Sequence, residues 1–211
     1  MEDRTGKLEE VAKEVATCHG CDLYKTANKS VPGEGNPVTK VMFIGEAPGY
    51  FEDQAGRPFV GQAGKLLDQL LVSICLKREE VFIANMVRHR PPNNRDPMPA
   101  EIEACSLYLD RQIKIIEPAI IVTLGRFSMN KFLPEVRISQ VHGQARFVDF
   151  SGKRYIVIPM YHPAAALRSG QVMQVLKTDF LKIKNFLNEK PEMEIKDEET
   201  KKEEQLSLIN N

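Results

Sequence analysis

Three polar side chains that can do chemistry stand at the ends of apolar runs in this sequence. Glu46 comes two residues after the run Val41–Ile44, Asn85 lies near the end of the run Val81–Met86, and His162 follows a third run. Short apolar runs bounded by turn residues predict buried strands. Open α/β sheets place their sites at the carboxyl ends of parallel strands. We therefore expect the three side chains to converge in one pocket.

A carboxylate, an amide and an imidazole in one pocket narrow the chemistry. Glu46 can act as a base or stabilise a cation. Asn85 presents a donor and an acceptor together, as a nucleobase edge requires. His162 opens a predicted helix, where a neutral imidazole can hydrogen bond to an oxyanion leaving group. Each has a plainer alternative, namely a carboxylate that caps backbone amides, a turn-forming Asn and a helix-capping His. Phe59, considered alone, is best explained by core packing.

Three of the four cysteines and one histidine suggest a metal site. Cys18 and Cys21 form a C-x-x-C pair, whose short loop can aim two thiolates at one metal. Cys105 is a third thiol, whereas Cys75 has helical spacing with its apolar neighbours and is predicted to lie in the core. His89, sixteen residues before Cys105, is the natural fourth ligand. The alternative is an exposed loop histidine between two arginines. Three thiolates and one imidazole fit zinc or an iron–sulfur cluster, and the spacing does not choose between them.

Alternating strands and helices are predicted to position these residues. The alternation favours a parallel α/β sheet with helices on both faces. The expected elements are helices over residues 5–17, 64–76, 99–113 and 164–187, strands over 40–44, 81–86 and 119–124, and a hairpin over 145–159 that turns at Ser151-Gly152.

Length and charge predict one domain followed by a tail. The 211 residues carry no formal net charge, but residues 1–187 hold 25 basic and 21 acidic residues, so the last 24 residues are acidic. A mildly basic body permits DNA binding without requiring it. We expect a domain over 1–187 and a disordered tail over 188–211. The sequence has no apolar run long enough for a membrane span and no signal peptide, so we expect a cytoplasmic protein.

Three motifs in order resemble those of the family 4 uracil-DNA glycosylases. They are GEAPGYFEDQAGRPFVGQAG at Gly45–Gly64, Asn85 followed by RPPNNRDP at Arg90–Pro97, and HPAAALR at His162–Arg168. The resemblance covers residues 15–187. It implies a three-layer α/β/α sandwich around a four-stranded parallel central sheet, and a mainly structural [4Fe–4S] cluster. It also implies hydrolysis of the N-glycosidic bond of deoxyuridine in DNA, which releases uracil and leaves an abasic site.

The resemblance gives two residues catalytic roles and two others a place at the DNA. Glu46 would position the attacking water and stabilise the oxocarbenium sugar. His162 would stabilise the charge on uracil O2 as the base departs. Leu167 and Arg168 would lie at the DNA and fill the gap left by the flipped nucleotide. Such flipping is needed because a base inside a duplex cannot reach a pocket.

Five further residues would bind the base, again by motif position. Phe59 would stack on the flipped uracil, Asn85 would read its edge, and Glu52 would crowd its C5 edge so that the methyl group of thymine collides. Gly45 and Ala47 would complete the substrate-binding set.

The sequence departs from the family at His89, where the family usually has a cysteine. The cluster ligands would then be Cys18, Cys21, His89 and Cys105, and imidazole does replace thiolate on iron in Rieske centres. A uracil-DNA-crosslinking subgroup also has a histidine near this position. That subgroup carries, in addition, an inserted basic loop with a histidine that traps the sugar covalently. The loop here is short, which argues for ordinary turnover. The alternative is a Cys/His metal protein that binds or covalently traps uracil-DNA without turnover.

The chain ends in a short apolar peptide. Gln205–Ile209 reads QLSLI, which is similar to the bacterial sliding-clamp-binding peptide with Ile in place of Phe. The alternative is a frayed tail with chance leucines. We expect a monomer that binds uracil-containing DNA and that a sliding clamp recruits through this peptide.

Overall fold

A six-stranded mixed sheet forms the centre of the computed structural model, which describes residues 3–187. The predicted tail over 188–211 therefore lies outside the described residues. The sheet order is β1-β3-β2-β4-β6-β5. The strands are β1 (Glu34–Gly35), β2 (Val41–Gly45), β3 (Phe82–Asn85), β4 (Ile120–Leu124), β5 (Arg146–Phe150) and β6 (Lys153–Met160).

Eight α-helices connect and cover these strands within the described part of the chain. They are α1 (Arg4–Ala16), α2 (Tyr50–Ala55), α3 (Gln62–Ser73), α4 (Pro99–Ile116), α5 (Arg126–Asn130), α6 (Ile138–Val141), α7 (Pro163–Ala166) and α8 (Gly170–Leu187). Three single turns of 3₁₀ helix are also present, namely η1 (Asp22–Lys25), η2 (Arg78–Glu80) and η3 (Pro92–Asn94).

The four inner strands are parallel, so the predicted four-stranded parallel core is confirmed. β3, β2, β4 and β6 pair in that order, and Gly45 is in register with Asn85. Two antiparallel edge strands, β1 and β5, extend this core. The register places the ends of β2 and β3 at one level, so the loops that follow them begin side by side.

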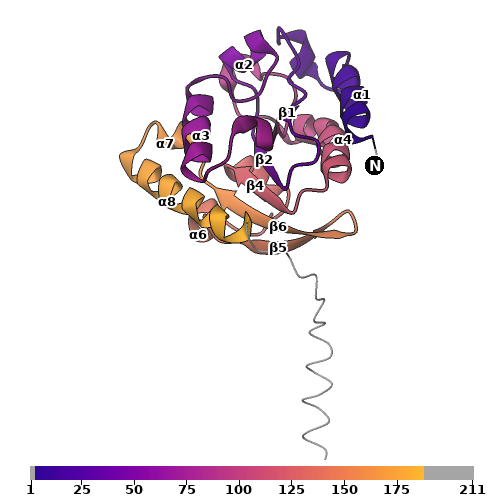
Figure 1. Cartoon of the computed structure of the whole chain (residues 1–211). Helices are drawn as coiled ribbons and strands as arrows, with labels where there is room; N and C mark the ends of the chain where they lie inside the picture. The colour runs from indigo at the N-terminus through magenta and orange to yellow at the C-terminus, as the bar shows by residue number, and fades with distance from the viewer. Residues whose placement is uncertain (1–2, 188–211) are drawn as a thin grey trace, which may run out of the picture.

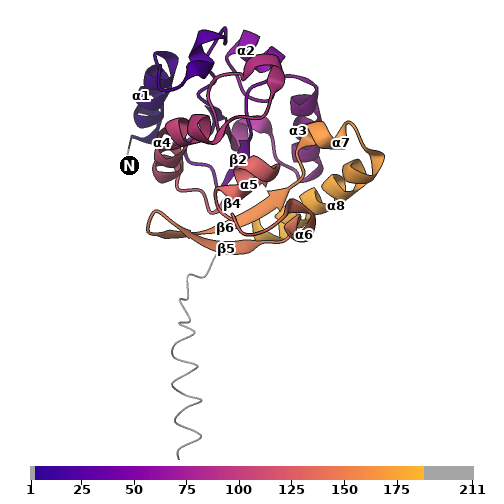
Figure 2. The ribbon, with the colours of Figure 1, turned by 180° about the vertical axis from the view of Figure 1, so that it is seen from behind.

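Helices cover both faces of the sheet, as Figures 1 and 2 show from opposite sides. One apolar core joins α3 and α8 to one face of the inner strands, and the Phe43 and Phe180 rings stack in it at 5.7 Å. A second core joins α4 to the other face. Helix α1 packs outside α4 through Val11, Val15 and Tyr108. The predicted three-layer sandwich is therefore confirmed, and both cores hold the strand ends in place.

The single helix predicted over residues 164–187 is wrong, because the chain breaks between α7 and α8. Ser169 caps α8: its hydroxyl accepts from the amide of Val172 at 3.4 Å and its carbonyl from that of Met173 at 2.9 Å. Serine before glycine favours a helix start over a helix interior. Leu167 and Arg168 are consequently presented on an exposed turn.

The core position predicted for Cys75 is also wrong. The residue is exposed and has a φ of +61°, one residue after the C-cap of α3 at Ile74. A left-handed residue past a helix end leaves the helical spacing. Several short elements were not predicted, namely β1, α2, α5, α6 and the three 3₁₀ turns.

Candidate active site

The pocket is organised by a close approach of three residues at the ends of β2 and β3. A Cβ on Gly45 would lie 2.5 Å from Asn85 Oδ1 and 2.6 Å from the ring of Phe59. Only glycine fits at position 45, because any side chain would displace both neighbours. The predicted substrate residues Gly45, Phe59 and Asn85 therefore lie together.

Phe59 is held in a conformation that few side chains adopt. Its φ is +50°, and a Cβ on Gly64 would lie 1.8 Å from its carbonyl oxygen. The Arg78 guanidinium fixes the loop by donating to that carbonyl at 3.1 Å and also to the carbonyl of Pro58. Strained backbone of this kind is typical of functional sites. The ring that results is buried and stacks on the His162 ring, with centroids 5.6 Å apart.

The His162 imidazole is neutral, and its protonation pattern is defined. The residue is the N-cap of α7, where its Nδ1 accepts a hydrogen bond from the Ala164 amide at 3.1 Å. A neutral ring that accepts at Nδ1 carries its proton on Nε2. Burial lowers the pKa of His162 to about 4, against a smaller raising effect of Glu52. At neutral pH the ring therefore offers one hydrogen bond donor and no charge.

Asn85 has a buried acceptor with no partner. The side chain is 2% exposed, and its Oδ1 makes no hydrogen bond within the part of the chain described here. A buried polar atom without a partner costs about 1–3 kcal/mol. A ligand that donates a hydrogen bond at this point would remove that cost. The atom therefore marks where a donor belongs.

The backbone of Glu46 is held in place by hydrogen bonds that do not involve its carboxylate. Its carbonyl oxygen accepts from the amides of Met86 at 3.1 Å and Val87 at 3.2 Å. This ties the loop after β2 to the loop after β3. Burial raises the pKa of Glu46, Asp96 raises it further and Arg126 lowers it. The carboxyl group is thus a stronger base than an exposed glutamate.

Glu52 has a structural part in the loop. Its carboxylate accepts from the amides of Val60 and Gly61, both at 2.8 Å, and from that of Gly49 at 3.1 Å. These bonds cap α2 and fix the segment beside Phe59. The side chain is also within electrostatic range of His162. Loss of Glu52 would therefore disturb the Phe59 loop, whatever else Glu52 does.

A charged pair beside Glu46 escaped the sequence reasoning. Arg126 opens α5 directly after β4, and its guanidinium forms an ion pair with Asp96 of the loop after β3. Both side chains influence the charge of Glu46. The only sequence signal was an arginine after a strand-ending glycine, which by itself indicates nothing specific.

The three predicted thiol ligands lie in one neighbourhood behind the Glu46 loop. Cys105 is a member of an apolar cluster against which Cys21 and Ala47 also pack, so these thiols lie near the residue that follows Glu46. Cys18 and Cys21 both lie within electrostatic range of Cys105, and burial raises the pKa of Cys105 to about 11. Cys18 also lines a polar cavity of about 160 Å³ together with His89.

These side chains are near one another without forming a metal site in the described residues, where no group of three or more His, Cys, Asp or Glu is arranged to hold an ion. The buried cation beside them nevertheless fits an anionic group. Arg88 is fully buried, its Nε has no hydrogen bond partner, and its guanidinium favours a charged Cys105. The donor set of Cys18, Cys21, Cys105 and His89 thus fits a thiolate-ligated cluster chemically.

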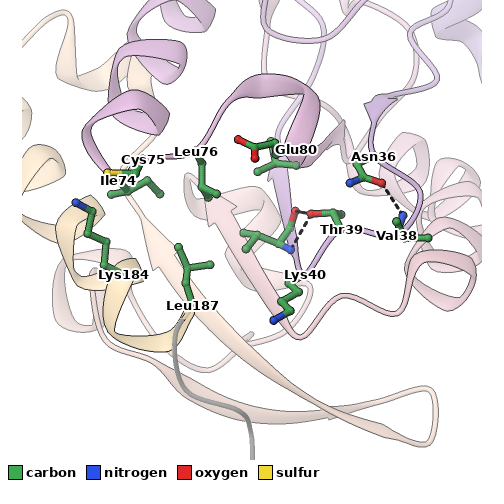
Figure 3. A pocket seen from close by; sticks show the side chains of 12 residues that line it. Asn36, Val38, Thr39, Lys40, Ile74, Cys75, Leu76, Glu80, Lys184 and Leu187 are labelled. Carbon is green, nitrogen blue, oxygen red and sulfur yellow. Dashed lines mark hydrogen bonds between the residues drawn. The ribbon is translucent and has the colours of Figure 1, made fainter.

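A cavity of about 590 Å³ lies elsewhere, at the amino ends of β2 and β3 (Figure 3). Val41, Val81 and the exposed Cys75 line it, and Lys184 reaches it from α8. None of the predicted catalytic, substrate or metal residues lines this cavity. Gly45 and Asn85 instead lie at the carboxyl ends of the same strands.

The fold and the polar residues at the carboxyl ends of its strands define an α/β domain with an enzyme-like site. Comparison with known proteins identifies its family. A model of the uracil DNA glycosylase superfamily matches residues 32–187. The chain is 50% identical over 185 residues to the type-4 uracil-DNA glycosylase of Sulfurisphaera tokodaii. The aligned region covers 85% of this chain and 84% of that relative. The chain therefore belongs to the uracil DNA glycosylase superfamily and, within it, to the type-4 uracil-DNA glycosylases.

Two further relatives agree with this placement. The type-4 uracil-DNA glycosylase of Archaeoglobus fulgidus is 47% identical over 188 residues, with 87% of this chain and 94% of that relative covered. That of Thermotoga maritima is 40% identical over 189 residues, with 89% and 98% covered. No helix in residues 3–187 is both long and apolar enough to cross a bilayer.

Proposed function

We propose that this chain removes uracil from DNA as a monofunctional glycosylase, in the manner that its family membership indicates. The observation that carries the proposal is the buried, unpartnered Oδ1 of Asn85 beside the Phe59 ring and the neutral His162. Uracil has a donor at N3 between two carbonyl acceptors. Asn85 Oδ1 accepts from N3–H, and the Asn85 amide donates to O4.

The reaction is a hydrolysis in which uracil leaves as an anion and takes up a proton from solvent after release. Water attacks C1′ of the sugar while the C1′–N1 bond breaks and its electron pair leaves with uracil. His162 Nε2–H donates to uracil O2, where the negative charge gathers. The Glu46 carboxylate orients the water, stabilises the cationic sugar and receives the proton. Donors aimed at developing charge are usually a large part of catalysis.

The remaining predicted residues complete the site. Phe59 stacks on the flipped base, a contact worth about 1–3 kcal/mol. Gly45 and Ala47 line the pocket, and Glu52 keeps thymine out at C5. Leu167 and Arg168, on the exposed turn between α7 and α8, enter the DNA where the base has left.

A release assay tests the activity. Oligonucleotides with a single uracil are incubated with the chain, and free uracil and alkali-labile abasic sites are measured. Glu46→Ala and His162→Ala should lose most of the activity, and an oligonucleotide with thymine at the same position should stay intact. A denaturing gel distinguishes the alternative. A protein that traps DNA covalently gives a shifted protein–DNA band and does not release uracil over repeated turnovers. Such a band, or binding without release, would contradict the proposal.

The site residues also support a [4Fe–4S] cluster, held by Cys18, Cys21, Cys105 and His89. Through these residues a bound cluster would link the segment before η1, which carries Cys21, to α4, which carries Cys105. The hydrolysis itself needs no electron transfer. The buried Arg88 charge, which has no carboxylate among its hydrogen bond partners, compensates the negative thiolates.

Iron and sulfide analysis tests the cluster, and its reduction potential tests the histidine ligand. Anaerobic protein should contain iron and sulfide with an absorbance band in the blue. His89→Cys should keep the cluster and lower its reduction potential, because imidazole raises the potential relative to thiolate. His89→Ala should lose iron. One zinc per chain without sulfide, or a potential unchanged in His89→Cys, would refute this ligand set.

The C-terminal peptide Gln205–Ile209 is proposed to bind a sliding clamp, with the chain acting as a monomer in the cytoplasm. Deletion of Gln205–Asn211 should abolish binding to a bacterial clamp in a pull-down and leave uracil release from short oligonucleotides unchanged. Clamp binding by the shortened chain would refute this role. Sedimentation at micromolar concentration checks the monomer.

A further inference from the structure

One central strand, β4, leads to none of the residues that the proposed hydrolysis uses. β2 leads to Glu46, β3 ends at Asn85, and β6 leads to His162. β4 lies between β2 and β6 in the sheet and is followed by Gly125 and Arg126 (Figure 2). Its carboxyl end therefore lies between the two catalytic residues, where a side chain can reach the substrate.

The residue that precedes Arg126 lies next to His162. Gly125 has a φ of +95°, its amide donates to the Met160 carbonyl at 2.8 Å, and a Cβ on it would lie 3.2 Å from His162 Cβ. The backbone that carries Arg126 is thus fixed against β6. Arg126 starts from a defined point at the mouth of the site.

The Arg126 side chain projects into solvent and is paired with a carboxylate. Its guanidinium lies 4.6 Å from the centroid of the Phe127 ring and forms an ion pair with Asp96. The two side chains are 60% and 62% exposed. An ion pair this exposed contributes little to stability and exchanges readily.

Asp96 is presented by an ordered loop. Arg95 donates to both carboxylate oxygens of Glu101, at 2.9 and 2.6 Å, and the Met98 amide donates to Glu101 at 2.7 Å. Arg95 also donates to the Asp96 carbonyl at 2.9 Å. The loop therefore holds the carboxylate at the place where Arg126 meets it.

We propose that Arg126 binds a backbone phosphate next to the flipped nucleotide, and that Asp96 occupies the guanidinium until DNA displaces it. The inference rests on the proposed function, since it names a contact of the same site with its DNA. A phosphodiester offers two oxygens to the guanidinium fork, as a carboxylate does. Asp96 is then a stand-in for the phosphate and opposes DNA binding.

Opposite signs for the two partners distinguish exchange from a structural pair. Arg126→Ala removes a phosphate contact and should weaken DNA binding about tenfold. Asp96→Asn removes the competitor and should tighten binding about two- to fivefold. If the pair merely braced the loop, both substitutions would weaken binding.

The binding probe is a duplex with a tetrahydrofuran abasic-site analogue in place of deoxyuridine, which needs no excision. Anisotropy gives Kd over a range of salt concentrations. For Arg126→Ala the slope of log Kd against log salt should fall by about 0.9, as expected for one lost phosphate contact. Thermal unfolding of each variant checks that the chain is folded.

The chain offers a matched control pair on the β5–β6 hairpin. Arg154 and Asp149 form an ion pair with exposures of 61% and 67%, close to those of Arg126 and Asp96. Arg154→Ala and Asp149→Asn should leave Kd within twofold of the unchanged chain. An Arg126→Ala chain with the original Kd and salt slope, or an Asp96→Asn chain that binds more weakly, would overturn the inference. Absence of uracil release would count against the proposed function alone, because the probe reports binding only.

Discussion

The predicted uracil pocket around Phe59 and the thiol neighbourhood around Cys105 differ in how completely the protein alone arranges their side chains. In the pocket, His162 is capped, the Phe59 ring is stacked on it, and Gly45 leaves the gap that both need. In the thiol neighbourhood, Cys105 and its partners are close but are not arranged around an ion within the described residues.

The difference follows from the kind of bond that organises each region. Backbone hydrogen bonds and ring packing form as the chain folds, so the pocket exists before its substrate arrives. Thiols ligate only as thiolates, and burial raises the pKa of Cys105 to about 11. A metal centre supplies the energy that removes those protons and draws the ligands together. The pocket is thus preorganised, whereas the thiol neighbourhood would depend on the proposed cluster for its final arrangement.

Removal of one thiolate should have the largest effect on the molecule. Cys105→Ser should lose iron and sulfide and destabilise the chain by more than about 4 kcal/mol, as expected when a metal site is broken. Denaturant unfolding under anaerobic conditions, with iron analysis, measures both. Cys75→Ser is the matched control, since Cys75 is exposed and should change neither quantity. A Cys105→Ser chain of full stability would mean that no metal centre supports this region.

Loss of the preformed donor should be the next largest effect. His162→Ala should slow single-turnover uracil release about 10²- to 10³-fold, which corresponds to about 2.7–4 kcal/mol. His162→Gln should recover part of the rate, because an amide N–H can replace the Nε2–H donor. Phe147→Ala, on the exposed face of β5, is the control and should release uracil at the original rate. An unchanged rate in His162→Ala would remove His162 from the chemistry.

Strand-level features of the fold were predictable because local pattern determines them. Apolar runs identified the four parallel strands, and Ser151-Gly152 identified the hairpin turn. The strand ends place Asn85 beside Gly45, and the Phe59 ring, which comes from a loop, stacks on His162. The expected convergence of the Glu46 carboxylate with Asn85 and His162 stays a prediction. What each side chain would do came from the motifs, and those roles stay predictions that the assays above address.

Features that depend on one residue's backbone or on distant partners were not predictable. Cys75 has the spacing of a core residue, yet a left-handed turn places it in solvent. The break at Ser169 depends on a cap that competes with helix continuation. The Arg126–Asp96 pair joins residues thirty positions apart in separate loops, and no local pattern encodes it.

Acid should lower the free energy of unfolding through protonation of His162, and this contribution can be measured separately. The folded-state pKa of His162 is lowered to about 4 from an ordinary 6.5. The unfolded chain therefore binds this proton first, and stability is lost as pH falls from 6.5 towards 4. By pH 5 the loss should reach about 1–2 kcal/mol, allowing for the part of the ring that meets solvent. The difference in unfolding free energy between the unchanged chain and His162→Gln, measured from pH 8 to pH 5, gives this quantity. A difference independent of pH would mean that the ring titrates normally.

The smallest effect should be a displacement of the pH–rate profile by the pair beside Glu46. Glu46 works as a carboxylate and burial raises its pKa, so the rate at saturating DNA should rise with pH on an acid limb above 4.5. Asp96 raises that pKa and Arg126 lowers it, so Asp96→Asn should move the limb to lower pH and Arg126→Ala to higher pH. The pKa of His162 is lowered to about 4, so the ring is mostly neutral on the upper part of this limb, which reports on Glu46.

Added salt should shrink both displacements, because exposed charges are screened. Limbs that coincide in all three proteins would place the pair too far from Glu46 to influence it, and would show that the pocket's electrostatics are set by burial alone.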